Sequence, residues 1–433
     1  MTQTAHTDVR LRVPDRAQVE WKTGCLDALL PAEHRARTIR AVVDKLDLSA
    51  FHAPIKARKG VVGRDMTDPR LLVSLWLYAS IRGVGSAREL DRLCAESNPY
   101  LWLCGGVSVN HHMLADFRTD HADALDQLFT SVIATLVKKG LVKVRRISQD
   151  GVRVRGAAGS SSFRRGSTLE GLQKEAAGHV RQLRELPDDP RKSAELSARR
   201  KAAKLRGTRE REERINAAAK LIPQLNARQE KAAKRLSKKQ RAERRKPRVS
   251  TTDPESARMK MGDGGYRPAV NMQLAVDTES RAIVGVDVSS EGVDYGQCEP
   301  MRAQVEDRTG RKVEEHLYDG GYVKTETIER ADAEGVTVYC PPKAPRDPDK
   351  QGEQFTPRPG DSAAIANWRE RMGGEAGKAI YRQRASTSET VNARMRRQGL
   401  TQLTVRGLKK ARCVLLWAAL TYNVALFAAS LVS

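Results

Sequence analysis

The sequence predicts an α/β fold in which a mixed sheet is flanked by helices, with a helical N-terminal domain and a basic helical insertion. Three observations predict this arrangement. Residues 1–140 show helical periodicity with capping signals, strand-like patterns occur at 142–156 and return after Ser250, and a charged helical stretch separates them. We therefore expect a helical domain over residues 1–140 and a sheet domain over 141–433, interrupted by an insertion at about 168–248.

The N-terminal domain is expected to be helical because its apolar stretches begin and end with helix signals. Asp68 precedes an apolar body that runs to Gly83, and Ser86 forms an S-x-x-E capping box with Glu89. The amphipathic stretch 121–140 ends in Lys-Lys-Gly, which is typical of a helix C-terminus.

The sheet is expected from five strand-like segments. Residues 142–156 form one long strand or a strand pair, with Asp150 near the middle. Segments 267–280 and 281–294 are expected to form an antiparallel pair that turns near Thr278 to Arg281. A fourth strand ending at Asp319, a helix and a fifth strand are expected at 312–319, 325–334 and 337–342.

The chain is strongly basic, with 77 Lys and Arg against 53 Asp and Glu and a formal net charge of +24. Basic clusters bind nucleic acid because they release counterions from the phosphates. Membrane-surface proteins of similar charge carry a polybasic tail or an amphipathic anchor, and neither is evident. We therefore expect double-stranded DNA as the partner, bound in part by the helical N-terminal domain, and no membrane.

Much of this charge lies in the insertion. Residues 191–248 contain 22 Lys and Arg against 6 Asp and Glu, and so supply 16 of the 24 excess positive charges. Pro223 interrupts the helical pattern, which favours a helical hairpin or a kinked helix over one continuous rod. The segment is either a DNA-gripping arm, which we favour, or a solvated spacer.

A polar connection over 341–374 leads to a basic helix and then to a final apolar helix over 413–433. That last stretch carries no charge and is nearly long enough to span a bilayer. Polar residues at 421–423 interrupt it, so we expect a helix buried in a soluble core. The six cysteines show no CxxC spacing, which argues against zinc and disulfides and fits a reducing cytoplasm.

The basic helix, residues 381–412, holds nine Lys and Arg and a single acid, Glu389. At about 100° per residue, five of its side chains fall within roughly 140° of one helical face. These five are Tyr381, Arg384, Glu389, Asn392 and Arg396. A lone carboxylate among phosphate-binding groups would repel DNA, unless it holds a divalent metal that contacts a phosphate. The alternative is a solvated helix whose Glu389 has no role.

Asp150, Asp319 and Glu389 each follow or occupy a different element, as expected where strand ends converge on a site. Three carboxylates that meet would stay ionised only around cations. Oxygen-only ligands favour Mg²⁺, with Mn²⁺ as a substitute, and two such ions about 4 Å apart support in-line attack on phosphate. Turn chemistry accounts for four competing acids, which are Asp263, Asp277, Asp287 and Asp294. For the nearby His316 we expect a structural role.

This order of elements resembles the DDE transposases of bacterial insertion sequences. The resemblance rests on SQDGVRVRG around Asp150, TTDPESARMKMGDGGYRPAVNMQLAVD, YDGGYVKTETIE around Asp319, the segment 381–423, and DPRLLVSLWLYASIRG with SVNHHMLADFRTDH near the N-terminus. It implies a ribonuclease H-like catalytic core, with Asp150, Asp319 and Glu389 as the metal-holding acids. It also implies DNA contacts by Tyr381, Arg384, Asn392 and Arg396.

The chain departs from the family's Tyr-Arg-Glu-Lys helix in two ways. Four residues separate Arg384 from Glu389, whereas the common spacing is three. The last basic position carries Arg396 in place of Lys. The insertion lies between the first two core strands, which is less usual than a position before the Glu helix.

The resemblance implies a metal-dependent DNA transposase, an endonuclease that cleaves at the ends of an insertion sequence and joins the 3′-hydroxyls to target DNA. Terminal inverted repeats and target DNA are the expected partners, bound by a homodimer or a higher oligomer in the cytoplasm, at the nucleoid. Two alternatives stay open: a catalytically inactive DNA-binding regulatory derivative, and a related nuclease that cleaves without joining.

Overall fold

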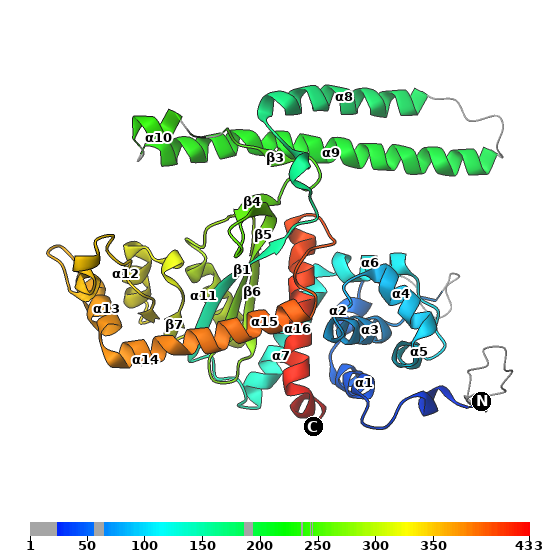
Figure 1. The fold of residues 1–433 in the computed structure, drawn as a ribbon. Helices are drawn as coiled ribbons and strands as arrows, with labels where there is room; N and C mark the ends of the chain where they lie inside the picture. Colours follow the sequence, from blue (N-terminus) through cyan, green and yellow to red (C-terminus); the bar gives the residue numbers. More distant parts are fainter. Residues whose placement is uncertain (1–23, 56–64, 186–193, 235–236, 243, 245) are drawn as a thin grey trace, which may run out of the picture.

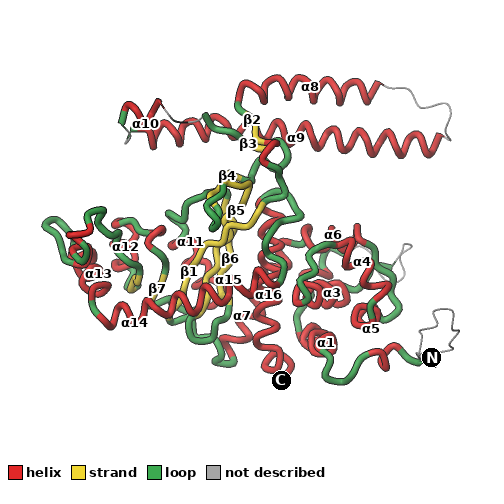
Figure 2. Tube along the Cα trace, viewed as in Figure 1, coloured by secondary structure: helices red, strands yellow, loops and turns green. Residues whose placement is uncertain are grey.

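A computed structural model describes residues 24–55, 65–185, 194–234, 237–242, 244 and 246–433. A central sheet lies between two groups of helices, and a long helical hairpin crosses above the sheet (Figures 1 and 2). The N-terminal helices and the last helix are on one side of the sheet, and the helices within residues 325–384 are on the other. Helices therefore flank the sheet from which Asp150 and Asp319 project.

The sheet has six strands in the order β4-β5-β1-β7-β8, with β6 also paired to β5. β1 is antiparallel to β5 and parallel to β7, so the sheet is mixed, as expected. The segment around Asp150 forms one long strand, and β5 and β6 form the expected antiparallel pair. The strands are β1 (Arg146–Arg155), β4 (Ala257–Lys260), β5 (Tyr266–Asp277), β6 (Ile283–Ser289), β7 (Glu315–Leu317) and β8 (Thr337–Tyr339).

The described N-terminal region is helical, and its helices begin where the caps predict. Asp68 accepts a hydrogen bond from the Arg70 amide at 2.8 Å, and Ser86 accepts one from the Glu89 amide at 3.4 Å. The helices are α1 (Arg35–Lys45), α2 (Ser49–His52), α3 (Pro69–Ile81), α4 (Ala87–Glu96), α5 (Asn98–Cys104), α6 (His111–Asp120) and α7 (Ala122–Lys138).

The last helix, α16 (Leu408–Val432), joins these helices to the sheet, because it packs against β6 as well as α1, α3, α6 and α7. It is long and apolar enough for a membrane span, but 67% of its most apolar window is buried inside the molecule. That burial is typical of a core helix in a soluble protein. Asn423 accepts from the Ile283 amide at 2.9 Å and donates to the Ile283 carbonyl at 2.7 Å. Its polar group is therefore satisfied within the core.

The insertion forms a helical hairpin, but not at the expected position. α8 (Gly166–Glu185) packs against α9 (Ala194–Ala233), and Pro223 lies inside α9. The expected hairpin is therefore present, but Pro223 lies within its second helix and does not form its turn. Apolar residues on both sides of Pro223 pack in one cluster with α8, and this packing overrides the local cost of proline. The chain enters the hairpin through β2 (Phe163–Arg164). After the short α10 (Lys238–Ala242), it returns to the sheet through β3 (Val249–Ser250).

Two predictions about the C-terminal third are wrong. The expected polar connection contains α13 (Ala363–Gly373), whose Trp368 and Met372 are buried. The expected single basic helix consists of α14 (Glu375–Arg384), a π-helical turn (Ala385–Glu389) and α15 (Thr390–Arg397), and a non-helical segment precedes α16. Gly399 and Gly407, both at positive φ, lie in that segment, which explains why the helix ends there. The remaining helices are α11 (Cys298–Thr309) and α12 (Thr325–Ala333).

His316, at the centre of β7, generates a prediction about stability. It is fully buried, its Nε2 has no hydrogen-bond partner, and burial lowers its pKa to about 3. Because this is below the value of an unfolded histidine, the stabilisation is complete above pH 6.5 and is lost as the pH falls toward 3. Protonation of the unfolded state at pH 5 should cost about 2 kcal/mol of unfolding free energy. We expect His316→Leu to remove this component in urea unfolding measured at pH 7.5 and pH 5; an unchanged pH dependence would contradict it.

Candidate functional site

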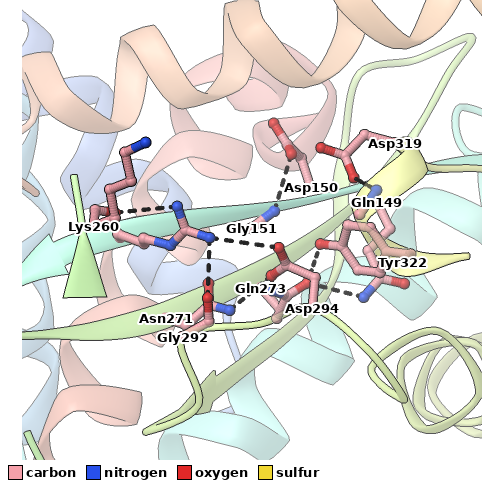
Figure 3. Close-up of polar contacts among 12 residues, drawn as sticks. Gln149, Asp150, Gly151, Lys260, Asn271, Gln273, Gly292, Asp294, Asp319 and Tyr322 are labelled. Carbon is pink, nitrogen blue, oxygen red and sulfur yellow. Dashed lines mark hydrogen bonds and ion pairs between the residues drawn. The ribbon is translucent and has the colours of Figure 1, made fainter. Parts of the chain in front are cut away.

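The register of the parallel strands brings Asp150 and Asp319 together. Ser148 on β1 is opposite Leu317 on β7, so the residues two positions further along each chain lie at the same level. Figure 3 shows the two carboxylates beside each other, one from β1 and one from the loop after β7. The sequence prediction placed Asp150 near the middle of its strand, and it does lie within β1. Asp319 was expected to end the fourth strand, and it follows β7 by two residues.

Asp150 is held by contacts from its own strand and from α14 and α15. It accepts hydrogen bonds from the Gly151 amide at 3.1 Å and from the Asn392 side chain at 2.9 Å. A guanidinium nitrogen of Arg384 lies 3.6 Å from Oδ1 of Asp150, the oxygen that accepts from Gly151. Burial raises the pKa of Asp150, the Arg384 charge opposes this rise, and the Asp319 carboxylate adds to it. Asp150 is thus a desolvated carboxylate next to another negative charge, a situation that a cation would relieve.

Asp319 begins a short 3₁₀ turn, in which its side chain accepts a hydrogen bond from the Gly321 amide at 2.7 Å. The same turn ends at Tyr322, whose hydroxyl donates to Gln273 on β5 at 2.5 Å. Tyr322 is buried. Its contact with Gln273 therefore anchors the turn, which includes Asp319, to the sheet. The glycines after Asp319 therefore form a fixed loop rather than a free one.

A buried polar network lies beneath the acids, as Figure 3 shows. Gln149, the neighbour of Asp150, donates to Gln273 at 3.0 Å, and Gln273 donates to Asp294 at 2.8 Å. Asn271 also donates to Asp294, at 2.7 Å. The three amide side chains are fully buried. Gln273 thus connects the strand of Asp150 to the turn of Asp319.

Sequence reasoning missed this network, and it assigned Asp294 to a turn. The signal was present in β5, where Asn271 and Gln273 are the two polar residues in the otherwise apolar stretch AVNMQLAV. Two amides at alternate positions of a buried strand face the same side and require partners there. Asp263 and Asp277 do stabilise turns, through hydrogen bonds to Gly265 and Ser280.

The π-helical turn decides how α14 and α15 face the sheet. A π turn holds one residue more than an α turn, so Arg384 and Glu389, five positions apart, are one turn apart. The face that contacts β1 consists of Arg384, Asn392 and Ser388, whose hydroxyl lies 2.6 Å from that of Ser148. These three residues are spaced by four, so Glu389, which follows Ser388, lies off this face and is exposed.

The structure does not bring all the predicted side chains to the acids. Tyr381 is half-buried, with the Arg384 guanidinium 5.8 Å from its ring centre. Glu389 and Arg396 are exposed, and neither contacts Asp150 or Asp319. Within the described ranges, no group of three or more His, Cys, Asp or Glu side chains is arranged to hold a metal. The carboxylate pair supplies oxygen ligands suited to Mg²⁺ or Mn²⁺, whereas the third acid stays apart.

Two segments of the chain match known families. Residues 24–120, which contain α1 to α6, match a family described as "Transposase domain (DUF772)". Residues 338–427, which contain α13 to α15 and most of α16, match a family described as "Transposase DDE domain". No curated protein and no solved structure matches the chain.

The second match includes Arg384, Glu389 and Asn392, whereas Asp150 and Asp319 lie outside both matched segments. The helical N-terminal region and the segment that faces the acids thus both match transposase domains, and the mixed sheet flanked by helices is consistent with a ribonuclease H-like core. In these two segments the chain is similar to transposases, and in the second to their DDE domain.

Proposed function

We propose that this protein cleaves DNA at the ends of an insertion sequence and joins the new 3′-hydroxyls to target DNA by in-line phosphoryl transfer. The observation that carries the proposal is the pair of neighbouring carboxylates, Asp150 on β1 and Asp319 in the loop after the adjacent parallel strand β7. The helix that faces them belongs to the segment that matches a transposase DDE domain. Glu389, on the same helix, is proposed as the third acid.

Asp150 and Asp319 would hold divalent cations, Mg²⁺ or Mn²⁺, together with Glu389. Bound there, such cations would supply an activated oxygen nucleophile and charge stabilisation for the leaving oxygen. Asn392 positions Asp150 through its hydrogen bond, and Arg384 places a positive charge beside the same carboxylate. A guanidinium at that position can also contact the phosphate to be cleaved.

The exposed Arg396 would contact a phosphate further along the DNA, and Tyr381 would support Arg384 from below. We further propose that the N-terminal helices bind the terminal repeats and that the enzyme acts as a homodimer or a higher oligomer on nucleoid DNA in the cytoplasm. The basic hairpin α8–α9 would act as an arm that grips DNA.

The exposed position of Glu389 favours one alternative, a DNA-binding derivative that lacks catalysis. Cleavage of a labelled element end in the presence of Mg²⁺ distinguishes the two functions. Cleavage without joined products would instead indicate a nuclease.

The three acids generate the main test. We expect Asp150→Asn, Asp319→Asn and Glu389→Gln each to reduce Mg²⁺-dependent cleavage to background while DNA binding is retained, because each change removes a carboxylate from the cation site. Cleavage and band-shift assays on the same DNA measure both. Asp263→Asn, which changes an exposed turn acid, is the matched control. Full cleavage by any of the three variants would remove that residue from the site.

Gly151 tests whether the polar network positions Asp150. A Cβ atom at this position would lie 2.5 Å from Gln273 Nε2 and 2.6 Å from Asp294 Oδ1. Because these atoms are hydrogen-bonded to each other, Gly151→Ala should shift β1 and cost about 1–3 kcal/mol of stability. We expect cleavage to fall about 10- to 100-fold, the range typical when support around a metal ligand is lost. Gly171→Ala in α8, where nothing lies within 4 Å, should leave cleavage unchanged.

The π-helical turn allows a deletion test. Removing Ser386, whose side chain is exposed, should convert the π turn into an α turn and keep Arg384 and Glu389 one turn apart. We expect this variant to retain cleavage. Inserting one alanine after Arg397, beyond the facing residues, should also be tolerated, whereas an alanine inserted after Glu389 should rotate Asn392 away from Asp150 and abolish cleavage. Loss of cleavage in the deletion variant alone would show that the π turn itself is needed.

A further inference from the structure

A cleft of about 520 Å³ separates the root of the helical hairpin from the end of the sheet. One wall is α9 at Leu221, Leu225 and Arg228, and the opposite wall is the segment that enters β4, at 254–258. The segment leading back from the arm, residues 246–249, also lines the cleft. Figure 1 shows β4 below the crossing of α9 and β3, at the end of the sheet where this cleft lies. Its volume is typical of sites that admit a group of nucleotide size.

The cleft is lined by five basic side chains, Arg228, Arg244, Lys246, Arg248 and Arg258, and by one acid, Glu255. Glu255 leaves most of this charge uncompensated, because it is a single carboxylate among five cations; it also accepts from the Leu408 amide at 2.9 Å and so caps α16. Arg228 pairs with Glu291 at 3.0 Å. Among the residues that the structure describes, Lys246, Arg248 and Arg258 have no acidic partner, and all three are exposed.

Unpaired cations in a concave site attract anions, because the low-dielectric walls focus their field. Leu221, Leu225 and Val249 add apolar surface to the lining of the cleft. A cleft that offers both cationic and apolar groups suits a sugar-phosphate backbone, in which charged phosphates are joined by sugars. An acidic peptide would present carboxylates on flexible side chains, without the regular spacing of phosphates.

The position of the cleft relative to the acids follows from β1. Ser256 in the cleft wall lies against Gly156, where an added Cβ atom would be 2.3 Å from its hydroxyl. Gly156 is six residues beyond Asp150, a distance of about 20 Å along a strand. Since one strand of DNA advances about 3.4 Å per nucleotide, a DNA chain could pass from the acids to the cleft in about six nucleotides.

We propose that this cleft binds the phosphodiester backbone of one DNA strand about six nucleotides from the bond that is cleaved. The inference rests on the proposed function, because it takes its substrate and its distance from cleavage near Asp150. It assigns to the root of the arm a fixed contact, with Lys246, Arg248 and Arg258 as the phosphate-binding groups. The arm then contributes to placing DNA on the acids rather than to general attraction alone.

The test compares Lys246→Gln/Arg248→Gln with Arg311→Gln/Lys312→Gln in the full-length protein. The control pair is exposed, changes net charge by the same amount, and precedes β7 at the opposite end of the sheet. Binding is measured over a range of salt concentrations on two sets of DNA duplexes. Long duplexes extend well beyond six nucleotides on both sides of the cut, and short ones end about three nucleotides from it on one side or the other.

On long DNA, we expect the cleft variant to bind about tenfold more weakly at physiological salt and to reduce the slope of log affinity against log salt by about 1.8, the value for two lost phosphate contacts. The control should match the unaltered protein. On the short duplexes that lack the contacted side, the cleft variant should bind as tightly as the unaltered protein does. This result would show that the variant is folded and that the rest of its DNA-binding surface is intact. A neutral methylphosphonate about six nucleotides from the cut should reproduce the loss in the unaltered protein.

Equal affinity and salt slope for the two double variants on long DNA would overturn the proposal, and so would an equal loss on long and short DNA. An acidic peptide that binds in the cleft without competing with the long or the short duplexes would assign the cleft to a protein partner. That result would also overturn the proposal. These outcomes are independent of catalysis. If Asp150→Asn cleaved normally, the proposed function would fail, while the binding data would still report on the cleft.

Discussion

The parallel pairing of β1 with β7 sets up the site, because it forces two carboxylates to lie side by side. Asp150 and Asp319 repel each other, and burial makes the ionised form of Asp150 still less favourable. The fold tolerates this cost because both strands are fixed elsewhere. β1 is paired along most of its length with β5, and β7 lies between β1 and β8. A pair of like charges held by a rigid sheet is a site prepared for a cation.

The surrounding polar groups make that arrangement specific. Above the sheet, Arg384 and Asn392 contact Asp150 from a helix far along the chain. Below it, Gln273 receives hydrogen bonds from Gln149 and Tyr322, and so connects the two acid-bearing segments. Each of these groups is buried or half-buried, where an unpaired polar atom is costly. A displaced strand would leave several of them unpaired, so the network penalises any other register between the acids.

The sequence predicts most of the sheet because strand signals are local. The alternation around Asp150 and the turn between β5 and β6 are encoded within short segments. What it could not show depends on contacts between distant segments. Pro223 remains inside α9 because α8 packs across it, and α13 forms in a polar stretch because Trp368 finds a buried position. The π turn likewise contains Ser388, whose hydroxyl is hydrogen-bonded to that of Ser148 on β1, a residue far away in the sequence. For the site, the pairing of Asp150 with Asp319 follows from the strand pattern, whereas the exposed position of Glu389 does not.

The point at which the hairpin is inserted has a mechanical consequence. The hairpin leaves the chain after β1 and returns before β4; β1 ends and β4 begins at the same end of β5, although β4 is an edge strand and β1 is a central one. Ala257 of β4 and Arg155 of β1 are both opposite Ala269 of β5, so the two ends of the insertion are held by one central strand. The root of the arm is therefore rigidly connected to the strand that carries Asp150. An insertion before the Glu389 helix would be held by α13 and α14 instead, on the other side of the molecule. With DNA bound to the arm as proposed, this connection through β1 would let a basic hairpin at this position align a substrate as well as attract it.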